Sequence, residues 1–570
     1  MVTLPPPPLT EGAPIDQSRA HPSATFCSNS IPSNPSHPVC PRFQPPPLKP
    51  HPDHHPAMLL RDITNARRHT RPPTLLKRRS SKTNAARARQ RRTTVHSLPN
   101  EVLTEIFVAA TFASEESRLD IPDILSQVSS RWRAITLNTS IFWTFIVVTF
   151  PFAAKQILRA KAALARSKNR PVDVHIDVRD PEWAWETDEG EHAVGSIDVV
   201  EIMEWLGPSH PRWRTLSILT DNWEPMQTFL AYSTMFSSLP TLETLSLNRC
   251  NAYAGLPGTT PDSYTPIALF GGNAQLSKLK HVVLSGVHID YSCSGFKDLL
   301  SLDLRNQSHG VSPTLQELCQ ILTASPELNS LSLVALSPSC SHGLEELKDA
   351  PITMSQLKSL TMGWWNVGDA AELLGVFRIP AVENLSLEDV GSSLLGVLEH
   401  STFDDFPPHD STLILDVLTE MSEARRNLPA ALSPPPITPA SSSRRPGETY
   451  SFPSRLRTLT INGAHLDPTT FSEFLPWLMN LEELELKSVD HKLISALSSI
   501  QMEPPSVDLC PTISNSGLGP ALRTLRLWPS IGGFQEVARA LYEIKMERPD
   551  LRIVDMAGLI LPEMVSGRTA

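Results

Sequence analysis

A short leucine pattern that recurs along most of the chain constrains its fold more than any other feature. The pattern is an apolar residue, two variable residues and then Leu-x-Leu. Its middle leucines at 302, 331, 360 and 385 are 29, 29 and 25 residues apart. The copies occupy residues 242–247, 279–284, 299–304, 328–333, 357–362, 382–387, 456–461, 481–486, 522–527 and, in degenerate form, 551–556. A pattern at this period predicts one structural unit repeated many times.

Each copy predicts a short strand, because alternate residues are apolar and would point into a core. The chain then returns as a helix, as predicted for residues 314–324 and 470–479. A single unit cannot bury its own apolar face, so neighbouring units have to stack into a curved solenoid. The pattern and its period resemble those of leucine-rich repeats.

Irregular spacings between the copies predict loop insertions. The middle positions 245 and 282 are 37 residues apart, and 484 and 525 are 41 apart. The longest interruption, residues 401–453, contains Pro434-Pro435-Pro436 and is predicted to be disordered. Its serine- and arginine-containing run, residues 441–445, is either a phosphorylation site or a plain solvated loop.

A second pattern lies upstream of the repeat and predicts two short helices. Pro99 suits the first turn of a helix, where its missing N–H costs nothing, and apolar residues from Val102 to Ala110 follow at helical spacing. Residues 114–120 are interpreted as an exposed link, and a second helix fits residues 123–137. An apolar anchor follows at residues 141–143. A few short helices cannot bury so many large apolar residues by themselves. Part of this surface is therefore predicted to meet a partner.

The upstream pattern resembles an F-box. That family begins with Leu-Pro, continues with a Glu-x-Leu-x-x-Ile-Phe helix and carries a Val-x-x-x-Trp-Arg helix before an aromatic anchor. The chain supplies Leu98-Pro99, Glu101 to Phe107, Val128 to Trp132-Arg133, and Phe142-Trp143. Ser129 or Ser130 stands where the family frequently has Cys, and the link over residues 113–122 is somewhat long. The alternative interpretation is an unrelated helical hairpin.

The resemblance implies an adaptor of a multi-subunit ubiquitin ligase. In that family the helices dock on a small Skp-type linker protein, which attaches to a cullin, and the rest of the chain binds a protein target. The partner-binding residues carried over from the motif are Leu98, Pro99, Val102, Leu103, Ile106, Phe107, Val128 and Trp132. Some of them must form the core of the helical domain instead, and the sequence does not divide them. Catalysis would belong to other subunits, and the adaptor would supply proximity.

The next segment extends the resemblance. Residues 157–161 predict a helix, and residues 170–176 predict a strand because their apolar side chains alternate. Another strand is predicted at residues 210–218. This order is similar to that of the large group of F-box proteins found in mushroom-forming fungi.

The first 92 residues differ in composition from the rest of the chain. Residues 1–60 contain 16 prolines and are predicted to be disordered, because they cannot bury enough apolar surface to offset the entropy of ordering. Residues 1–92 hold 15 Lys+Arg against 4 Asp+Glu, a net charge of +11, whereas the remainder holds 35 against 56, a net charge of −21. The acidic body is a poor generic binder of nucleic acid, which requires clustered positive charge.

The basic segment of residues 61–92 has the two-cluster spacing of a nuclear import signal. The candidate import residues are Lys77, Arg78, Arg79, Arg87, Arg89, Arg91 and Arg92. The alternative interpretation is a solvated basic linker. A nucleic-acid-binding arm is disfavoured, because no aromatic residue is interleaved to stack on bases.

Several functional classes lack their sequence signals. The 7 cysteines show no paired spacing, which favours a reducing, intracellular compartment, either nucleus or cytoplasm. Zinc-ligand spacings and phosphate-binding glycine loops are missing, so we predict no metal ligand, no cofactor and no catalytic residue. The longest apolar run, residues 141–154, is too short to span a bilayer, and the N-terminus lacks the apolar core of a signal peptide.

The sequence therefore predicts an α+β chain of several parts. These are a disordered tail (1–94), an all-α F-box domain (95–148), a connecting segment (149–220), a leucine-rich-repeat-like solenoid (221–400), a disordered insertion (401–453) and the rest of the solenoid (454–570). The predicted function is that of a substrate-recognition adaptor of an SCF-type cullin ubiquitin ligase. The alternatives are a scaffold that uses the F-box without ubiquitin transfer and a nuclear regulatory protein led by its basic arm.

Overall fold

The described part of the chain is a mixed α/β structure. The computed structural model describes residues 95–183, 192–250, 265–272, 274–307, 311–336, 351–391, 411–423, 455–499, 521–528 and 534–555. The predicted disordered tail and the candidate import residues lie outside these ranges. The twelve α-helices in these ranges are α2 (Asn100–Thr111), α3 (Glu115–Val128), α4 (Ser130–Asn138), α5 (Ala154–Arg166), α6 (Ser196–Leu206), α7 (Trp223–Ser233), α8 (Leu315–Thr323), α10 (Val367–Gly375), α12 (Thr412–Glu423), α13 (Pro468–Phe474), α14 (His491–Ser499) and α15 (Phe534–Glu547).

A 13-stranded sheet forms the centre of the fold, and each strand pairs in parallel with its neighbour in chain order. Its strands are β1 (Phe145–Thr149), β2 (Val172–Asp177), β3 (Trp213–Thr220), β4 (Thr244–Arg249), β5 (His281–Ser285), β6 (Ser301–Arg305), β7 (Ser330–Val334), β9 (Ser359–Trp364), β11 (Asn384–Asp389), β12 (Thr458–Asn462), β13 (Glu483–Lys487), β14 (Thr524–Trp528) and β15 (Arg552–Asp555). The short strands β8 (Ile352–Thr353) and β10 (Phe377–Arg378) form a separate pair. Parallel neighbours require crossover connections, which most of the helices supply.

Two rows of apolar side chains cross the sheet from strand to strand. The first row is Ile146, Val174, Leu216, Leu245, Val282, Leu302, Leu331, Leu360, Leu385, Leu459, Leu484, Leu525 and Ile553. The second row lies two residues further along each strand, from Val148 to Leu527. All of these except Ile553 are buried in one core shared with the helices. The alternation predicted from the leucine pattern is confirmed.

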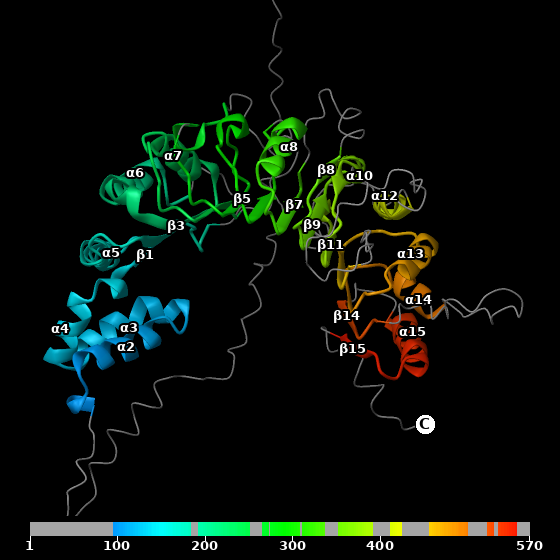
Figure 1. Ribbon diagram of the computed structural model, residues 1–570, viewed down its shortest axis with the longest axis horizontal. Helices are drawn as coiled ribbons and strands as arrows, with labels where there is room; N and C mark the ends of the chain where they lie inside the picture. Colours follow the sequence, from blue (N-terminus) through cyan, green and yellow to red (C-terminus); the bar gives the residue numbers. More distant parts are fainter. Residues whose placement is uncertain are drawn as a thin grey trace, which may run out of the picture. The chain divides into compact units, whose positions relative to one another are not determined.

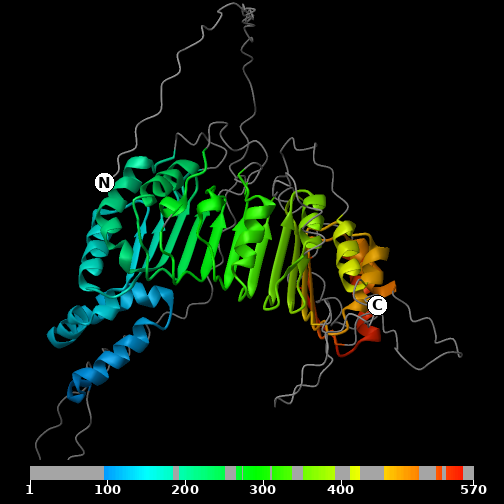
Figure 2. The ribbon, with the colours of Figure 1, turned by 45° about the horizontal axis from the view of Figure 1, so that its top comes forward.

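The two faces of the sheet differ in character. Helices α6, α7, α8, α10 and α13 to α15 lie on one side of the strands (Figure 1), and the strands follow one another in chain order across the sheet (Figure 2). We call the other side the open face, because its side chains alternate with the apolar rows and most of them are half-buried. Its central strands carry mainly serine and threonine, as in Thr244, Ser246, Ser301, Ser330, Ser359, Thr361, Ser386, Thr458 and Thr460.

A backbone conformation recurs two residues after the second apolar row. The φ angle there is positive at Gly286 (62°), Asn306 (52°), Ala335 (54°), Gly463 (66°) and Ser488 (50°). Left-handed backbone is easy for glycine and costs other residues roughly 1–2 kcal/mol. The repeat therefore shows in the backbone as well as in the leucine pattern.

The sheet begins earlier than the sequence predicts. β1, β2 and β3 precede residue 221, where the solenoid is predicted to start, yet they pair with one another and with β4. The predicted strands at 170–176 and 210–218 correspond to β2 and β3. Valine and isoleucine fill most of the apolar rows in β1 and β2, which hides these strands from a leucine-based search. The predicted connecting segment is therefore part of the sheet.

The prediction of a disordered insertion over residues 401–453 is wrong for its middle part. Thr412–Glu423 form α12, and Ile414, Leu415 and Leu418 are buried in the main core. The proline and serine content of the segment conceals this short amphipathic helix. Residues 401–410 and 424–453 lie outside the described ranges.

The two helices predicted between copies of the repeat are present. The helix predicted at 314–324 is α8, which begins with a reciprocal cap: the Thr314 hydroxyl accepts from the Glu317 N–H (3.2 Å), and the Glu317 carboxylate accepts from the Thr314 N–H (2.8 Å). The helix predicted at 470–479 is α13, which begins two residues earlier, after a cap by Asp467. It ends in a 3-10 turn, η9 (Leu475–Trp477).

Candidate docking helices and their attachment to the sheet

Helix α2 buries one side and exposes another. Leu103 and Phe107 are each 1 % exposed, whereas Val102 and Ile106 are 43 % and 49 % exposed. Pro99 lies at the cap position immediately before the helix rather than within its first turn. The apolar residues that the sequence places on one face therefore divide into a core pair and an exposed pair.

The second half of the segment is two helices, not the single helix predicted over residues 123–137. α3 begins at Glu115, so most of the predicted link over 114–120 is helical, and the Ser114 hydroxyl caps it. Ser129 is extended and separates α3 from α4, and its hydroxyl accepts a hydrogen bond from the Trp132 N–H (3.2 Å). Serine is a favoured N-cap residue. The two serine caps therefore explain where each helix starts.

Aromatic packing joins α2 to α4. The rings of Phe107 and Trp132 are 4.6 Å apart between centroids, a contact that contributes roughly 0.5–1.5 kcal/mol beyond the buried area. In the 3-10 turn η2 (Ser140–Trp143), the Trp143 indole donates to the Thr136 carbonyl (2.9 Å). The guanidinium of Arg166 in α5 lies 4.5 Å from the centre of the Trp143 ring. The predicted apolar anchor thus belongs largely to the core.

Arg131 of α4 holds the start of α2. Its guanidinium donates to the carbonyls of His96 (2.8 Å) and Leu98 (2.6 Å) and to the side-chain oxygen of Asn100 (2.9 and 2.7 Å). The five donors of an arginine allow one side chain to satisfy all three acceptors. Arg131 occupies a variable position of the sequence motif, whereas Arg133 is the arginine of its Trp-Arg pair, so the motif does not single out Arg131.

Helices α2 and α3 each expose a pair of apolar side chains four residues apart. Val102 and Ile106 form the pair on α2, and Ile124 and Val128 (48 % and 56 % exposed) form the pair on α3. Side chains four apart share one helix face, and α2 packs against α3. We call these four side chains the exposed quartet. Exposed apolar side chains gathered in a patch mark interaction sites on soluble domains.

An ion triad around one buried carboxylate attaches α3 to the sheet. Asp173 of β2 is 3 % exposed, and its carboxylate accepts hydrogen bonds from Arg118 of α3 and from Arg214 of β3 (2.8 and 2.6 Å). Burial raises the pKa of Asp173, but hydrogen bonds from Arg214 and Arg118 outweigh it, so the pKa is lowered from its ordinary value of 3.8. The guanidinium of Arg118 also lies over the Phe145 ring of β1, 4.4 Å from its centre.

A second arginine links α3 to α5. Arg159 is paired with Asp123 (2.7 Å) and donates to the Leu119 carbonyl. Asp120 lies 3.6 Å away. Helix α3 is therefore held by one arginine contact to the sheet, from Arg118 to Asp173, and by another to α5, from Arg159.

The predicted partner-binding residues fall into three classes. Pro99, Val102, Ile106 and Val128 are exposed, Leu98 and Trp132 are half-buried, and Leu103 and Phe107 are buried. Ile124 completes the exposed quartet and is absent from the predicted set. Within the ranges that the structure describes, no group of three or more His, Cys, Asp or Glu side chains is placed to hold a metal ion. No described helix combines the length and apolar character needed to cross a membrane.

The open face ends in a polar and aromatic cluster on its last strands. Trp528 of β14 is 41 % exposed and donates from its indole to Glu485 (3.2 Å). Lys487 lies 3.3 Å from the same carboxylate and 5.9 Å from the Trp528 ring centre. Exposed tryptophans ringed by polar groups are frequent centres of protein interfaces.

Comparison with known proteins identifies the helical segment. A family model described as F-box-like matches residues 95–149. The match runs from the 3-10 turn η1 (Val95–Ser97) through α2, α3, α4 and η2 into β1. The F-box-like match thus ends at the last residue of β1, the first strand of the sheet. No curated protein matches the chain.

Proposed function

We propose that the chain is a substrate-recognition adaptor of an SCF-type cullin ubiquitin ligase. Domains of the F-box-like class generally bind Skp-type linker proteins, which supports an adaptor role. The observation that carries the proposal is the exposed quartet, because two packed helices of one small domain leave four large apolar side chains in water. A protein partner would remove that surface from water.

The docking contact in this proposal is made by the exposed part of the predicted set. Pro99, Val102, Ile106 and Val128 would touch the linker, together with Ile124. Leu103 and Phe107 would support them from the core, and Trp132 would fix α4 behind Phe107. Arg131 would hold Leu98-Pro99 in place.

The sheet region in this proposal is a leucine-rich-repeat solenoid whose open face binds the protein target. The regular register of the apolar rows and the recurring left-handed residue support a repeated unit. Polar side chains on the open face suit hydrogen bonding to a target, and Trp528 is the most exposed aromatic residue among those strands. The adaptor would contribute proximity rather than chemistry.

Co-purification tests the proposal in cells. The tagged full-length chain is expected to bring down a Skp-type linker and a cullin, and Ile106→Asp combined with Val128→Asp is expected to lose both. Leu158→Asp on α5 and Ile197→Asp on α6 are matched controls, because these side chains are 67 % and 76 % exposed outside the quartet. Failure of the unmodified chain to retain the linker would contradict the proposal.

The same experiment separates the adaptor from its alternatives. Retention of the linker without a cullin would favour a scaffold that uses the F-box without ubiquitin transfer. A nuclear regulatory protein would need residues 61–92 to carry a reporter into the nucleus, and a reporter that stays in the cytoplasm excludes that import signal. Proximity labelling by the full chain, compared with a chain lacking residues 97–143, would identify targets that depend on the F-box.

A further inference from the structure

Positive charge is concentrated where the F-box-like domain meets the sheet. Residues 124–172 contain 8 Lys+Arg and no Asp or Glu, whereas residues 93–570 as a whole carry a net charge of −21. The acid-free stretch runs from α3 through α4, η2, β1 and α5 to the first residue of β2. Figure 1 shows α5 between the docking helices and α6. An otherwise acidic body therefore carries one markedly basic region.

Two arginines at the end of α5 are oriented by the F-box-like domain. Arg166 lies over the Trp143 ring of η2, 4.5 Å from its centre, and Arg170 donates from its Nε to the Ser140 hydroxyl (2.8 Å). Within the part of the chain that the structure describes, neither arginine forms a salt bridge. A guanidinium that is already held in place loses less side-chain entropy when it binds a carboxylate.

Two more cations lie at the turn that follows α5. Arg212 donates to the Ser167 hydroxyl (3.1 Å) and to the Arg170 carbonyl (3.3 Å), and Lys168 is exposed. Burial lowers the pKa of Arg212, and no described carboxylate opposes that shift. Asp173, which ends the acid-free stretch, is already held in the ion triad. We call the following four residues the basic turn: Arg166, Lys168, Arg170 and Arg212.

We propose that the basic turn binds an acidic peptide segment of a partner protein. Clustered arginines recognise carboxylates through paired N–H donors, and so concentrated a charge complements a segment rich in Asp and Glu. Nucleic acid fits less well, because every described aromatic side chain of residues 124–172 is buried or half-buried and cannot stack on bases. The basic turn is separate from the exposed quartet and from the open face, and the proposal does not depend on the adaptor function.

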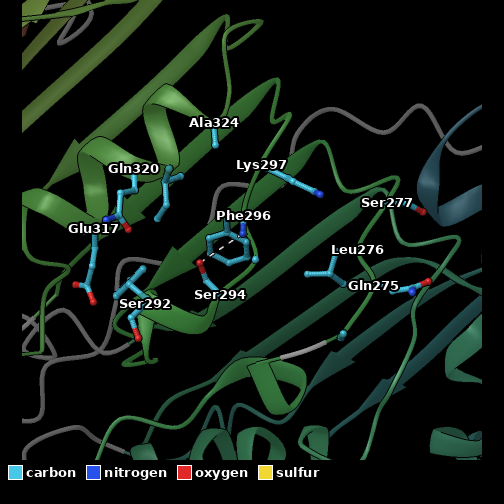
Figure 3. Close-up of a pocket in the computed structure, with 14 residues that line it drawn as sticks. Gln275, Leu276, Ser277, Ser292, Ser294, Phe296, Lys297, Glu317, Gln320 and Ala324 are labelled. Carbon is cyan, nitrogen blue, oxygen red and sulfur yellow. Dashed lines mark hydrogen bonds between the residues drawn. The ribbon is translucent and has the colours of Figure 1, made fainter.

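A cavity of about 630 Å³ beside α8 is a competing location for such a segment. Figure 3 shows Lys297 and Glu317 among its lining residues. Lys297 is the only cation among these lining residues, all of which the structure describes, and Glu317 offsets its charge. The cavity therefore lacks the excess of positive charge found at the basic turn, and exposed Lys297 provides a control position.

Fluorescence anisotropy of a labelled deca-glutamate peptide tests the proposal on the full-length chain. The candidate import residues are replaced by glutamine in every protein, because the basic residues 61–92 would bind the same probe. Lys168→Glu combined with Arg170→Glu is expected to weaken binding at least about tenfold. The control Lys297→Glu is expected to change it by less than about twofold.

Two further substitutions keep the result independent of folding. Lys168 has a φ of 56°, a conformation that glycine adopts without strain, so Lys168→Gly removes the charge without weakening the turn. It is expected to weaken the peptide roughly two- to fivefold. Asn169→Lys adds a cation at the neighbouring exposed position and should strengthen binding by a similar factor. Thermal denaturation should show all variants folded.

Four outcomes would overturn the proposal. The first is a loss of binding in Lys297→Glu as large as that in the double variant, and the second is a peptide affinity that Asn169→Lys leaves unchanged. The third is tighter binding of a single-stranded DNA of equal charge through the same residues, which would make nucleic acid the ligand. The fourth is self-association in sedimentation that the double variant abolishes, which would make a second copy of the chain the occupant.

Discussion

Arg118 of α3 donates a hydrogen bond to the buried carboxylate of Asp173 in β2, which joins the F-box-like domain directly to the sheet. Arg214 of β3 also donates hydrogen bonds to this carboxylate. The side chain of Asp173 is 4 % exposed, against 18 % for Arg118 and 41 % for Arg214. The carboxylate therefore depends on both arginines for compensation of its buried charge.

Asp173→Asn is expected to lower the free energy of unfolding by about 3 kcal/mol. Removal of one partner from a buried ion pair leaves the other charges uncompensated, and the exposure of Arg214 keeps the loss near the lower end of the range. Urea denaturation measures it. The control is Asp303→Asn, which removes a more exposed pair with Arg305 and should cost less than about 1 kcal/mol. Equal losses would contradict the role given to the triad.

The Asp173 contribution should also depend on pH in a defined direction. Its folded-state pKa is lowered, by hydrogen bonds from the two arginines that outweigh burial. The stabilisation is therefore present above the unfolded-state pKa of about 3.9 and is lost as the pH falls through the lower folded value. The stability difference between the unmodified chain and Asp173→Asn should be constant from pH 7 to pH 5 and shrink only below about pH 4.

His288 should make the protein less stable in mild acid. Burial, with a smaller effect of Arg249, lowers the pKa of His288 to about 3. The unfolded chain binds this proton below about pH 6.5 and the folded chain does not, so stability falls by about 1.4 kcal/mol per pH unit below 6.5. His288→Gln should flatten the stability curve between pH 6.5 and 5. An unchanged slope in His288→Gln would disprove the assignment.

Ser488→Gly is expected to stabilise the protein by about 0.5–1 kcal/mol. Ser488 is exposed and has a φ of 50°, where glycine avoids the strain of a left-handed residue but costs more entropy on folding. Gly463 occupies the same position on the neighbouring strand with a φ of 66°, so Gly463→Ala should destabilise by about 1 kcal/mol. Thermal denaturation of both variants checks the two signs, and equal signs would refute a repeated left-handed position.

Arg131→Lys should weaken the start of α2 although it keeps the positive charge. A lysine cannot bridge His96, Leu98 and Asn100 as the arginine fork does. We expect hydrogen exchange at the N-terminal turn of α2 to become faster in Arg131→Lys and to stay unchanged in Arg133→Lys. Equal protection in both variants would show that Leu98-Pro99 is held by other contacts.

The leucine spacing makes much of the sheet predictable. From Leu302 to Leu385 the middle leucine of each copy occupies the first apolar row, so the pattern locates these strands directly. β1 and β2 keep the rows with valine and isoleucine, which many strands contain, so the first part of the sheet is hidden.

The sequence predicts the burial of individual side chains in the docking helices less well. Apolar residues stand in adjacent pairs, Val102 with Leu103 and Ile106 with Phe107, and both members of each pair fit a helical stripe. In the structure Leu103 and Phe107 are the buried members, and Phe107 packs against Trp132 of α4, a tertiary contact that the helical spacing does not reveal. The break at Ser129 is equally ambiguous, since serine occurs both within helices and as a cap.

Binding of the purified full-length chain to a purified Skp-type linker protein, measured by isothermal titration calorimetry, tests the central claim most directly. We predict a one-to-one complex, a loss of affinity of at least about tenfold, or 1.4 kcal/mol, for Ile106→Asp combined with Val128→Asp, and unchanged affinity for Leu158→Asp. Circular dichroism should show the same folded content in all three proteins. Absence of binding by the unmodified chain, or equal binding by the double variant, would contradict the account.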